Sequence, residues 1–234
     1  MIHHDVDQGS TEWLKLRIGI PTASNFHKIV TPTGKLSKQS RHYAFFLVAE
    51  KLLNQSLESL QGLEWIERGK ELEPAAVKMF EFERDVETRP CGFITTDDMR
   101  MGCSPDRLVG TNGALELKCP APQTHVAYML DGFGDDYVPQ VQGQLLIGEF
   151  AYVDRYSYHP ELPPVLVRTH RDEAFISTLS GALEQFCGEL DEMHRRVMLT
   201  GLFAEKRQMR AAIDIVAKSQ DPDIVGRIIE NGMN

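Results

Sequence analysis

The sequence contains no apolar run close to the roughly 20 residues that a membrane-spanning helix needs. Its first residues, Met1 to Asp5, have neither the basic region nor the apolar region of a signal peptide. The four cysteines lack the paired spacing of a metal site, so we expect them to be reduced. These absences argue against a membrane-bound or secreted protein and favour a cytoplasmic one.

The chain also lacks an excess of positive charge. Its 25 Lys and Arg residues face 34 Asp and Glu residues, for a net charge of −9. This balance argues against a protein that coats nucleic acid with a basic surface, although a local channel can be basic while the outside is acidic. At 234 residues, with 42% hydrophobic and 25% charged residues, the composition is typical of a soluble globular enzyme.

One stretch, residues 103–119, carries a recognisable chemistry. Asp106 follows a proline and precedes a Gly/Asn-rich turn at residues 110–113, which predicts a hairpin. On its second strand, alternation places Glu116 and Lys118 on one face. Carboxylate oxygens suit Mg²⁺, and a lysine beside them can position or deprotonate a water, or neutralise charge on a phosphate. The arrangement is typical of a metal-dependent nuclease.

The same stretch resembles known nucleases. Pro105-Asp106, followed after nine residues by Glu116-Leu117-Lys118, resembles the PD-(D/E)xK nucleases. More narrowly, Cys-Ser-Pro-Asp and Leu-Glu-Leu-Lys-Cys-Pro resemble the phage lambda exonuclease, or YqaJ-type viral recombinase, family. Trp-x-x-x-Arg-x-Gly-x-x-Thr-Ala-Ser at residues 13–24 is similar to that family as well. The resemblance spans about residues 10–197.

This resemblance implies a Mg²⁺ site, with Mn²⁺ able to substitute. Asp106, Glu116 and the backbone carbonyl of Leu117 are the expected ligands, and Lys118 is expected to activate or orient the attacking water.

A further glutamate is expected to complete the metal site. In the family it follows a Gly-Lys-x-x pattern, and the offset from Gly69 selects Glu73. Glu71 is the competing candidate.

The resemblance also implies a pocket for the 5′-terminal phosphate of DNA. Its expected members are Arg17, Ser24, Ser104 and a glutamine at the start of the helix near residues 139–147. Gln140 matches this glutamine best, with Gln142 second. A guanidinium, two hydroxyls and an amide are apt donors to phosphate. The residues alone, without the resemblance, favour a simpler interpretation, in which Arg17 is an exposed side chain and Ser24 is a helix N-cap.

The expected fold is one α/β domain with a PD-(D/E)xK nuclease core, in which helices flank a mixed central sheet. We expect a mobile N-terminus at residues 1–9, an exonuclease domain at 10–200, and a C-terminal helical extension at 201–234 packed on or beside it. The patterns predict helices at 11–17, from 22, at 38–54, 64–84 and 139–147, from 172, and near 202–217 and 222–230, and strands at 93–95, 101–103, 151–159 and 165–171.

The motif and the resemblance together predict a Mg²⁺-dependent 5′-to-3′ exonuclease. It would degrade one strand of linear double-stranded DNA from a 5′-phosphorylated end, in phage-type single-strand annealing recombination. The resemblance implies a homotrimeric ring, a partner single-strand annealing recombinase, and a phage or prophage gene expressed in a bacterial host. Two alternatives remain: a structure- or sequence-specific endonuclease on the same core, and a catalytically inactive DNA-binding or assembly protein.

Overall fold

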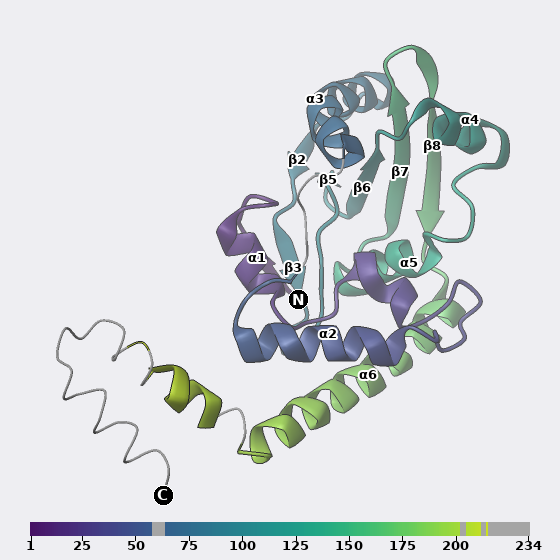
Figure 1. Cartoon of the computed structure of the whole chain (residues 1–234). Coiled ribbons are helices and arrows are strands. Elements are labelled where there is room, and N and C mark those ends of the chain that lie inside the picture. Colours follow the sequence, from purple (N-terminus) through teal and green to yellow (C-terminus); the bar gives the residue numbers. More distant parts are fainter. Residues whose placement is uncertain (58–63, 202–204, 212–213, 215–234) are drawn as a thin grey trace, which may run out of the picture. The chain divides into compact units, whose positions relative to one another are not determined.

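A five-stranded mixed sheet of order β2-β5-β6-β7-β8 forms the centre of the structure, a computed structural model that describes residues 1–57, 64–201, 205–211 and 214 (Figure 1). β6 pairs antiparallel with β5 and parallel with β7, so it is a central strand of the sheet. The expectation of a mixed central sheet is confirmed. The five strands are β2 (Thr88–Pro90), β5 (Arg107–Val109), β6 (Gly113–Lys118), β7 (Tyr152–His159) and β8 (Leu162–His170).

A second, three-stranded sheet differs from expectation. Its strands, in the order β1-β3-β4, are β1 (Ile2–His4), β3 (Phe93–Thr95) and β4 (Gly102–Cys103). β3 and β4 were expected, but as a lead into the central hairpin. Residues 1–9 were expected to be mobile, whereas the structure pairs Ile2–His4 with β3. Backbone hydrogen bonds make this pairing, and they do not depend on the side chains. A strand of three residues is also too short to show an alternation of polar and apolar side chains.

Seven helices lie within residues 11–199 in the part of the chain that the structure describes (Figure 1). They are α1 (Thr11–Arg17), the 3₁₀ helix η1 (Ala23–Lys28), α2 (Ser40–Leu53), α3 (Glu64–Arg84), α4 (Pro122–Asp131), α5 (Val138–Ile147) and α6 (Glu173–Leu199). The helix expected from residue 22 is thus a short 3₁₀ helix, with Thr22 rather than Ser24 at its N-cap position. α4 was not predicted, although a proline at the first position of a helix is a known start signal.

The two faces of the central sheet carry different chemistry. Leu115, Leu117 and Tyr156 pack with residues of α3, and the ring centroid of Phe80 lies 5.4 Å from that of Tyr156. Because strand side chains alternate, Glu116 points to the opposite face. The predicted alternation along β6 is therefore confirmed, and it separates an apolar face from a polar one.

The chain divides into two units, residues 1–190 and 191–234, and every candidate site residue lies in the first. Within that unit α6 buries Leu179, Leu183, Phe186 and Leu190, which recur at the spacing of three or four residues expected of an amphipathic helix. At the start of this apolar stripe Ile176 is buried, rather than the expected Phe175. Of the helices expected after residue 201, residues 205–211 are helical and the helix near 222–230 lies outside the described residues. None of the described helices is long and apolar enough to cross a membrane.

A glycine allows α5 and η1 to approach each other. A Cβ atom on Gly143 would lie 2.4 Å from Cδ2 of the Phe26 ring, which is fully buried. Since α5 carries the candidate glutamine and η1 carries Ser24, this contact sets the separation of two site elements.

We predict that Gly143→Ala lowers the free energy of unfolding by about 1–3 kcal/mol, because the added methyl group overpacks the contact with Phe26. Gly181→Ala is the matched control, since Gly181 is an exposed helical glycine on which a Cβ atom would meet no other element within 4 Å. It should raise stability by up to about 1 kcal/mol through helix propensity. Urea unfolding of both variants measures the difference, and equal effects would contradict the packing argument.

Candidate active site

Asp106 and Leu117 meet where the β5–β6 ladder ends. The last register pair is Arg107 with Leu115, so β5 offers Leu117 no backbone partner. The N–H group of Leu117 instead donates to the Asp106 carboxylate. In a strand, the N–H and C=O groups of one residue point to the same side. The Leu117 carbonyl therefore faces the side of β6 on which Asp106 lies, as expected of a pair of ligands.

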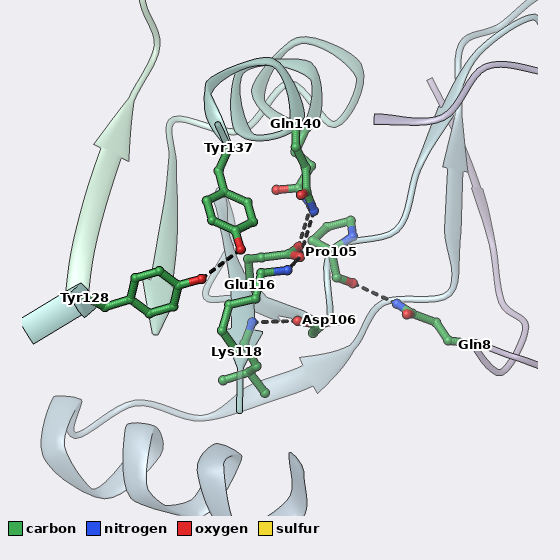
Figure 2. A network of polar contacts seen from close by, with 10 residues as sticks. Gln8, Pro105, Asp106, Glu116, Lys118, Tyr128, Tyr137 and Gln140 are labelled. Carbon is green, nitrogen blue, oxygen red and sulfur yellow. Dashed lines mark hydrogen bonds and ion pairs between the residues drawn. The ribbon is translucent and has the colours of Figure 1, made fainter. Parts of the chain in front are cut away.

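Glu116 is the most heavily bonded acid of the site, and it is only 5% exposed. Its Oε1 accepts from Nζ of Lys118 at 2.8 Å and from Nε2 of Gln140 at 2.7 Å (Figure 2). Its Oε2 accepts from Nε2 of Gln144, also at 2.7 Å. Three donors thus hold this carboxylate in one orientation on the polar face of the sheet.

The glutamines of α5 divide between the two sides of the helix. Residues four apart share a helix face, so Gln140 and Gln144 both reach Glu116. Gln142 points elsewhere: its Nε2 donates to the carbonyl of His170, and its Oε1 accepts from the N–H group of Asp172. Of the two candidate glutamines, Gln140 therefore faces the site, and Gln142 fastens α5 to the end of β8.

The site has more acidic than basic side chains. Burial raises the pKa of Asp106 well above its usual range, and the neighbouring charge of Glu116 raises it further. Burial alone would lower the pKa of Lys118, but the charges of Glu116 and Asp106 outweigh it and raise that pKa. One lysine thus faces two carboxylates, and an added cation would be stabilised there.

Glu73 adds to this negative potential. Its charge raises the pKa of Asp106, by less than burial and the charge of Glu116 do. Glu73 and Asp106 also line the same groove, of about 950 Å³. Glu71 is exposed and does not line that groove. The geometry therefore brings Glu73, and not Glu71, to the side of Asp106. Across residues 1–57, 64–201, 205–211 and 214, no group of three His, Cys, Asp or Glu side chains is arranged to hold a metal ion directly.

The residues nevertheless fit a hydrated Mg²⁺ ion. Oε1 of Gln144 is buried beside Glu116 and has no hydrogen-bond partner in the described part of the chain. Such an atom needs a donor, and the water of a hydrated ion is one. Two carboxylates and the Leu117 carbonyl supply the oxygen ligands that Mg²⁺ prefers, and Mg²⁺ usually retains several waters.

Two of the expected phosphate ligands meet across a tryptophan. Nε1 of Trp13 donates to Oγ of Ser104 at 2.9 Å, and that hydroxyl donates to the carbonyl of Gly92 at 2.8 Å. The guanidinium carbon of Arg17 lies 4.0 Å from the centroid of the Trp13 ring. Arg17 is 9% exposed, so its interpretation as an ordinary exposed arginine is wrong.

Ser24 is connected to the region of Arg17 and Ser104 through Thr22 and strand β4. Its hydroxyl lies 3.3 Å from that of Thr22, which bridges to Gly102, two residues before Ser104. Ser24 itself is exposed. Gln140 bonds to Glu116 rather than to any of the other three expected phosphate ligands. The structure thus groups Arg17 with Ser104, holds Ser24 on the adjoining η1, and joins Gln140 to the metal site.

Two residues of the site were not foreseen from the sequence. Gln144 follows Gln140 by four residues, so helical periodicity could have placed it on the same face. The ring centroid of Tyr137 lies 5.3 Å from Nζ of Lys118, and its hydroxyl is 2.8 Å from that of Tyr128 (Figure 2). No sequence signal relates this tyrosine to the lysine, because α5 must first pack on the sheet.

The mixed sheet, with Asp106 directly before β5 and with Glu116 and Lys118 on β6, is the core of a PD-(D/E)xK-type nuclease. The chain belongs to the family of the YqaJ-like viral recombinase domain, whose model matches residues 12–151. It is similar to the solved structure of the alkaline exonuclease LHK-Exo from Laribacter hongkongensis, with 27% identity and a TM-score of 0.74 over 82% of this chain and 98% of that one.

Two further solved structures are similar. LHK-Exo in complex with dAMP is 28% identical, with a TM-score of 0.75 and the same coverage. A phage-related exonuclease from Haemophilus somnus 129PT is 15% identical, with a TM-score of 0.62 over 76% of this chain and 96% of that one, and it shares the fold. No curated protein matches the chain.

We predict that Gln144→Glu makes stability depend on Mg²⁺. A carboxylate at this position would be buried against Glu116, so in EDTA the free energy of unfolding should fall by about 2 kcal/mol or more. Saturating Mg²⁺ should restore most of the loss, because a cation at the site offsets the added charge. Thermal unfolding with EDTA and with Mg²⁺ measures both effects.

Gln142→Glu is the matched control, because Gln142 is also buried on α5 but bonds to the backbone of His170 and Asp172. Its destabilisation should be the same with and without Mg²⁺. An equal Mg²⁺ response in the two variants would show that the ion does not bind beside Gln144.

Proposed function

We propose that this protein is a Mg²⁺-dependent 5′-to-3′ exonuclease that degrades one strand of linear double-stranded DNA from a 5′-phosphorylated end. The observation that carries the proposal is the cluster of Asp106, Glu116 and Lys118 at the end of the β5–β6 ladder. The family and the likeness to an alkaline exonuclease support it. LHK-Exo was solved with dAMP, a 5′-mononucleotide of the kind that an exonuclease releases from DNA.

In this proposal the acids of the site bind metal. Asp106, Glu116, the Leu117 carbonyl and Glu73 would hold Mg²⁺ or, in its place, Mn²⁺. When bound, the ion supplies Lewis-acid stabilisation of phosphate charge and lowers the pKa of a water ligand. Lys118, held by Glu116, orients the attacking water and faces the charge that develops on the phosphate.

The start point on DNA would be set by a separate phosphate pocket. Arg17, Ser24, Ser104 and Gln140 are the proposed ligands of the 5′-terminal phosphate. Arg17 stacks on Trp13, which limits the orientations of its guanidinium group. A phosphate held there would place each scissile bond at a constant distance from the metal ligands, so cleavage would proceed one nucleotide at a time.

We further propose that the protein acts in the cytoplasm of a bacterial host as a homotrimeric ring on DNA, in phage-type recombination, together with a single-strand annealing recombinase. The family supports this setting. A closed circular duplex distinguishes the proposed exonuclease from an endonuclease, since an exonuclease should leave the circle intact.

We predict that Asp106→Asn and Glu116→Gln each abolish nucleotide release, because each replaces an anionic ligand by a neutral one of the same shape. Duplex DNA binding should persist, and Ca²⁺ should support binding without turnover, since it takes more ligands in a looser geometry than Mg²⁺. Release of nucleotides from end-labelled linear duplex measures activity, and gel shifts in Ca²⁺ measure binding. Wild-type rates in either variant would rule out this metal site.

The phosphate pocket predicts a preference for one kind of DNA end. Wild-type protein should cut a 5′-phosphorylated duplex faster than the same duplex with a 5′-hydroxyl. Arg17→Lys keeps the charge but loses the fork of donors, so it should reduce this preference by roughly 10- to 100-fold, the equivalent of about 1.5–3 kcal/mol. The ratio of the two rates within each protein is its own control for folding. A variant slowed equally on both ends would place Arg17 in a packing role.

A further inference from the structure

We propose that Gln8 is a positioning residue of the active site, and that residues 1–9 are therefore part of the catalytic framework. The inference deepens the proposed function, since it concerns the alignment of the proposed metal ligand Asp106. It starts from one side-chain amide that joins two strands of the chain next to that acid.

The Gln8 amide uses both of its N–H groups on backbone oxygens. Nε2 donates to the carbonyl of Cys91 at 2.7 Å. It also donates to the carbonyl of Pro105 at 2.9 Å (Figure 2). The Pro105 carbonyl belongs to the peptide group that enters Asp106, so the amide restrains the plane from which the carboxylate side chain departs. A primary amide has two N–H donors, and both are satisfied here.

A side-chain donor is needed at this point because the backbone pairing between β2 and β5 has ended. β2 and β5 pair up to Pro90 with Arg107, and Cys91 and Pro105 lie just beyond that last pair. Only a long contact of 3.5 Å, from the N–H group of Cys91 to the carbonyl of Asp106, continues the pairing. The carbonyls of Cys91 and Pro105 converge at this point, and Gln8 supplies a donor to each of them.

Gln8 is itself held from both sides. On its N-terminal side β1 pairs with β3, and the side chain of His4 is hydrogen bonded to that of Thr95 at 3.0 Å. On its C-terminal side the N–H group of Ser10 donates to the carbonyl of Asp7 at 3.0 Å, where α1 begins. Residues 4–6 pack directly against Gly92: a Cβ atom added at this glycine would lie 2.2 Å from the carbonyl oxygen of His4. The amide is thus carried on ordered backbone.

The same segment also borders the site. His3 to Gly9 line one wall of the groove that Glu73 and Asp106 line as well. Loss of the Gln8 donors would leave two carbonyls unpaired and free the Pro105 peptide to rotate. Asp106 would then lose its alignment with the Leu117 N–H group and with the other ligands. The expected defect is in metal binding and rate, not in recognition of the DNA end.

Gln8→Met tests this inference, because methionine has nearly the same length, is neutral and donates no hydrogen bond. Mn²⁺ affinity, measured by calorimetry on the full chain without DNA, should fall about tenfold, the usual scale for loss of a group that orients a ligand. The Mg²⁺ concentration for half-maximal nucleotide release should rise in parallel, while the ratio of rates on 5′-phosphate and 5′-hydroxyl ends stays unchanged. Gln185→Met, at an exposed glutamine bonded to Glu189 on α6, is the matched control.

The inference is overturned if Mn²⁺ affinity stays within twofold of the wild-type value, or if Gln8→Met only lowers the unfolding midpoint. If this variant does not fold, Gln8→Lys, which keeps N–H donors for the two carbonyls, should fold and bind Mn²⁺ within about threefold of wild type, and a larger loss overturns the inference. A wild-type chain that binds Mn²⁺ but releases no nucleotide would refute the proposed function alone, because the comparison of Mn²⁺ affinities would still decide the role of Gln8.

Discussion

The buried carboxylate of Glu116 is the constraint on which the site depends. A charge removed from water is costly unless it is paired and fully hydrogen bonded. Here Lys118 comes from the same strand, while Gln140 and Gln144 must come from another element. Those two bonds require one face of α5 to lie against the polar face of β6. The position of the helix therefore follows from the need to satisfy a single side chain.

The position of α5 also determines where other residues of the site lie. Gln142, on its opposite side, ties the helix to the end of β8, so α5 is bonded on both sides. Gly143 then lets η1 pack closely, and η1 carries Ser24. Residues expected to bind metal and residues expected to bind the terminal phosphate thus share one helix as their support. A small shift of α5 would change the distance between the two groups, and under the proposed function that distance would set where a strand is cut.

Local patterns were enough to predict much of this arrangement before the structure. Alternation along residues 113–118 predicted which face carries Glu116, because strand geometry has a fixed period of two. The resemblance to the family selected Glu73 and Gln140, and the fold brings both beside the acids of the site. Gln8 and Tyr137 could not be foreseen, since their roles arise from contacts between segments far apart in sequence. The strand at Ile2–His4 was missed for a related reason: backbone pairing with β3 leaves no trace in side-chain pattern.

The charged residues of the proposed site differ in sign between the metal ligands and the phosphate pocket. Asp106, Glu116 and Glu73 make its metal-binding side negative, and a phosphate would be repelled there without a cation. Arg17, in contrast, offers a positive charge to a phosphate whether or not metal is present. Under the proposed function, the end of the DNA would be held independently of metal, while the scissile phosphate would enter only with the ion. Under the proposed function, this separation makes metal binding the step that commits a bound end to cleavage.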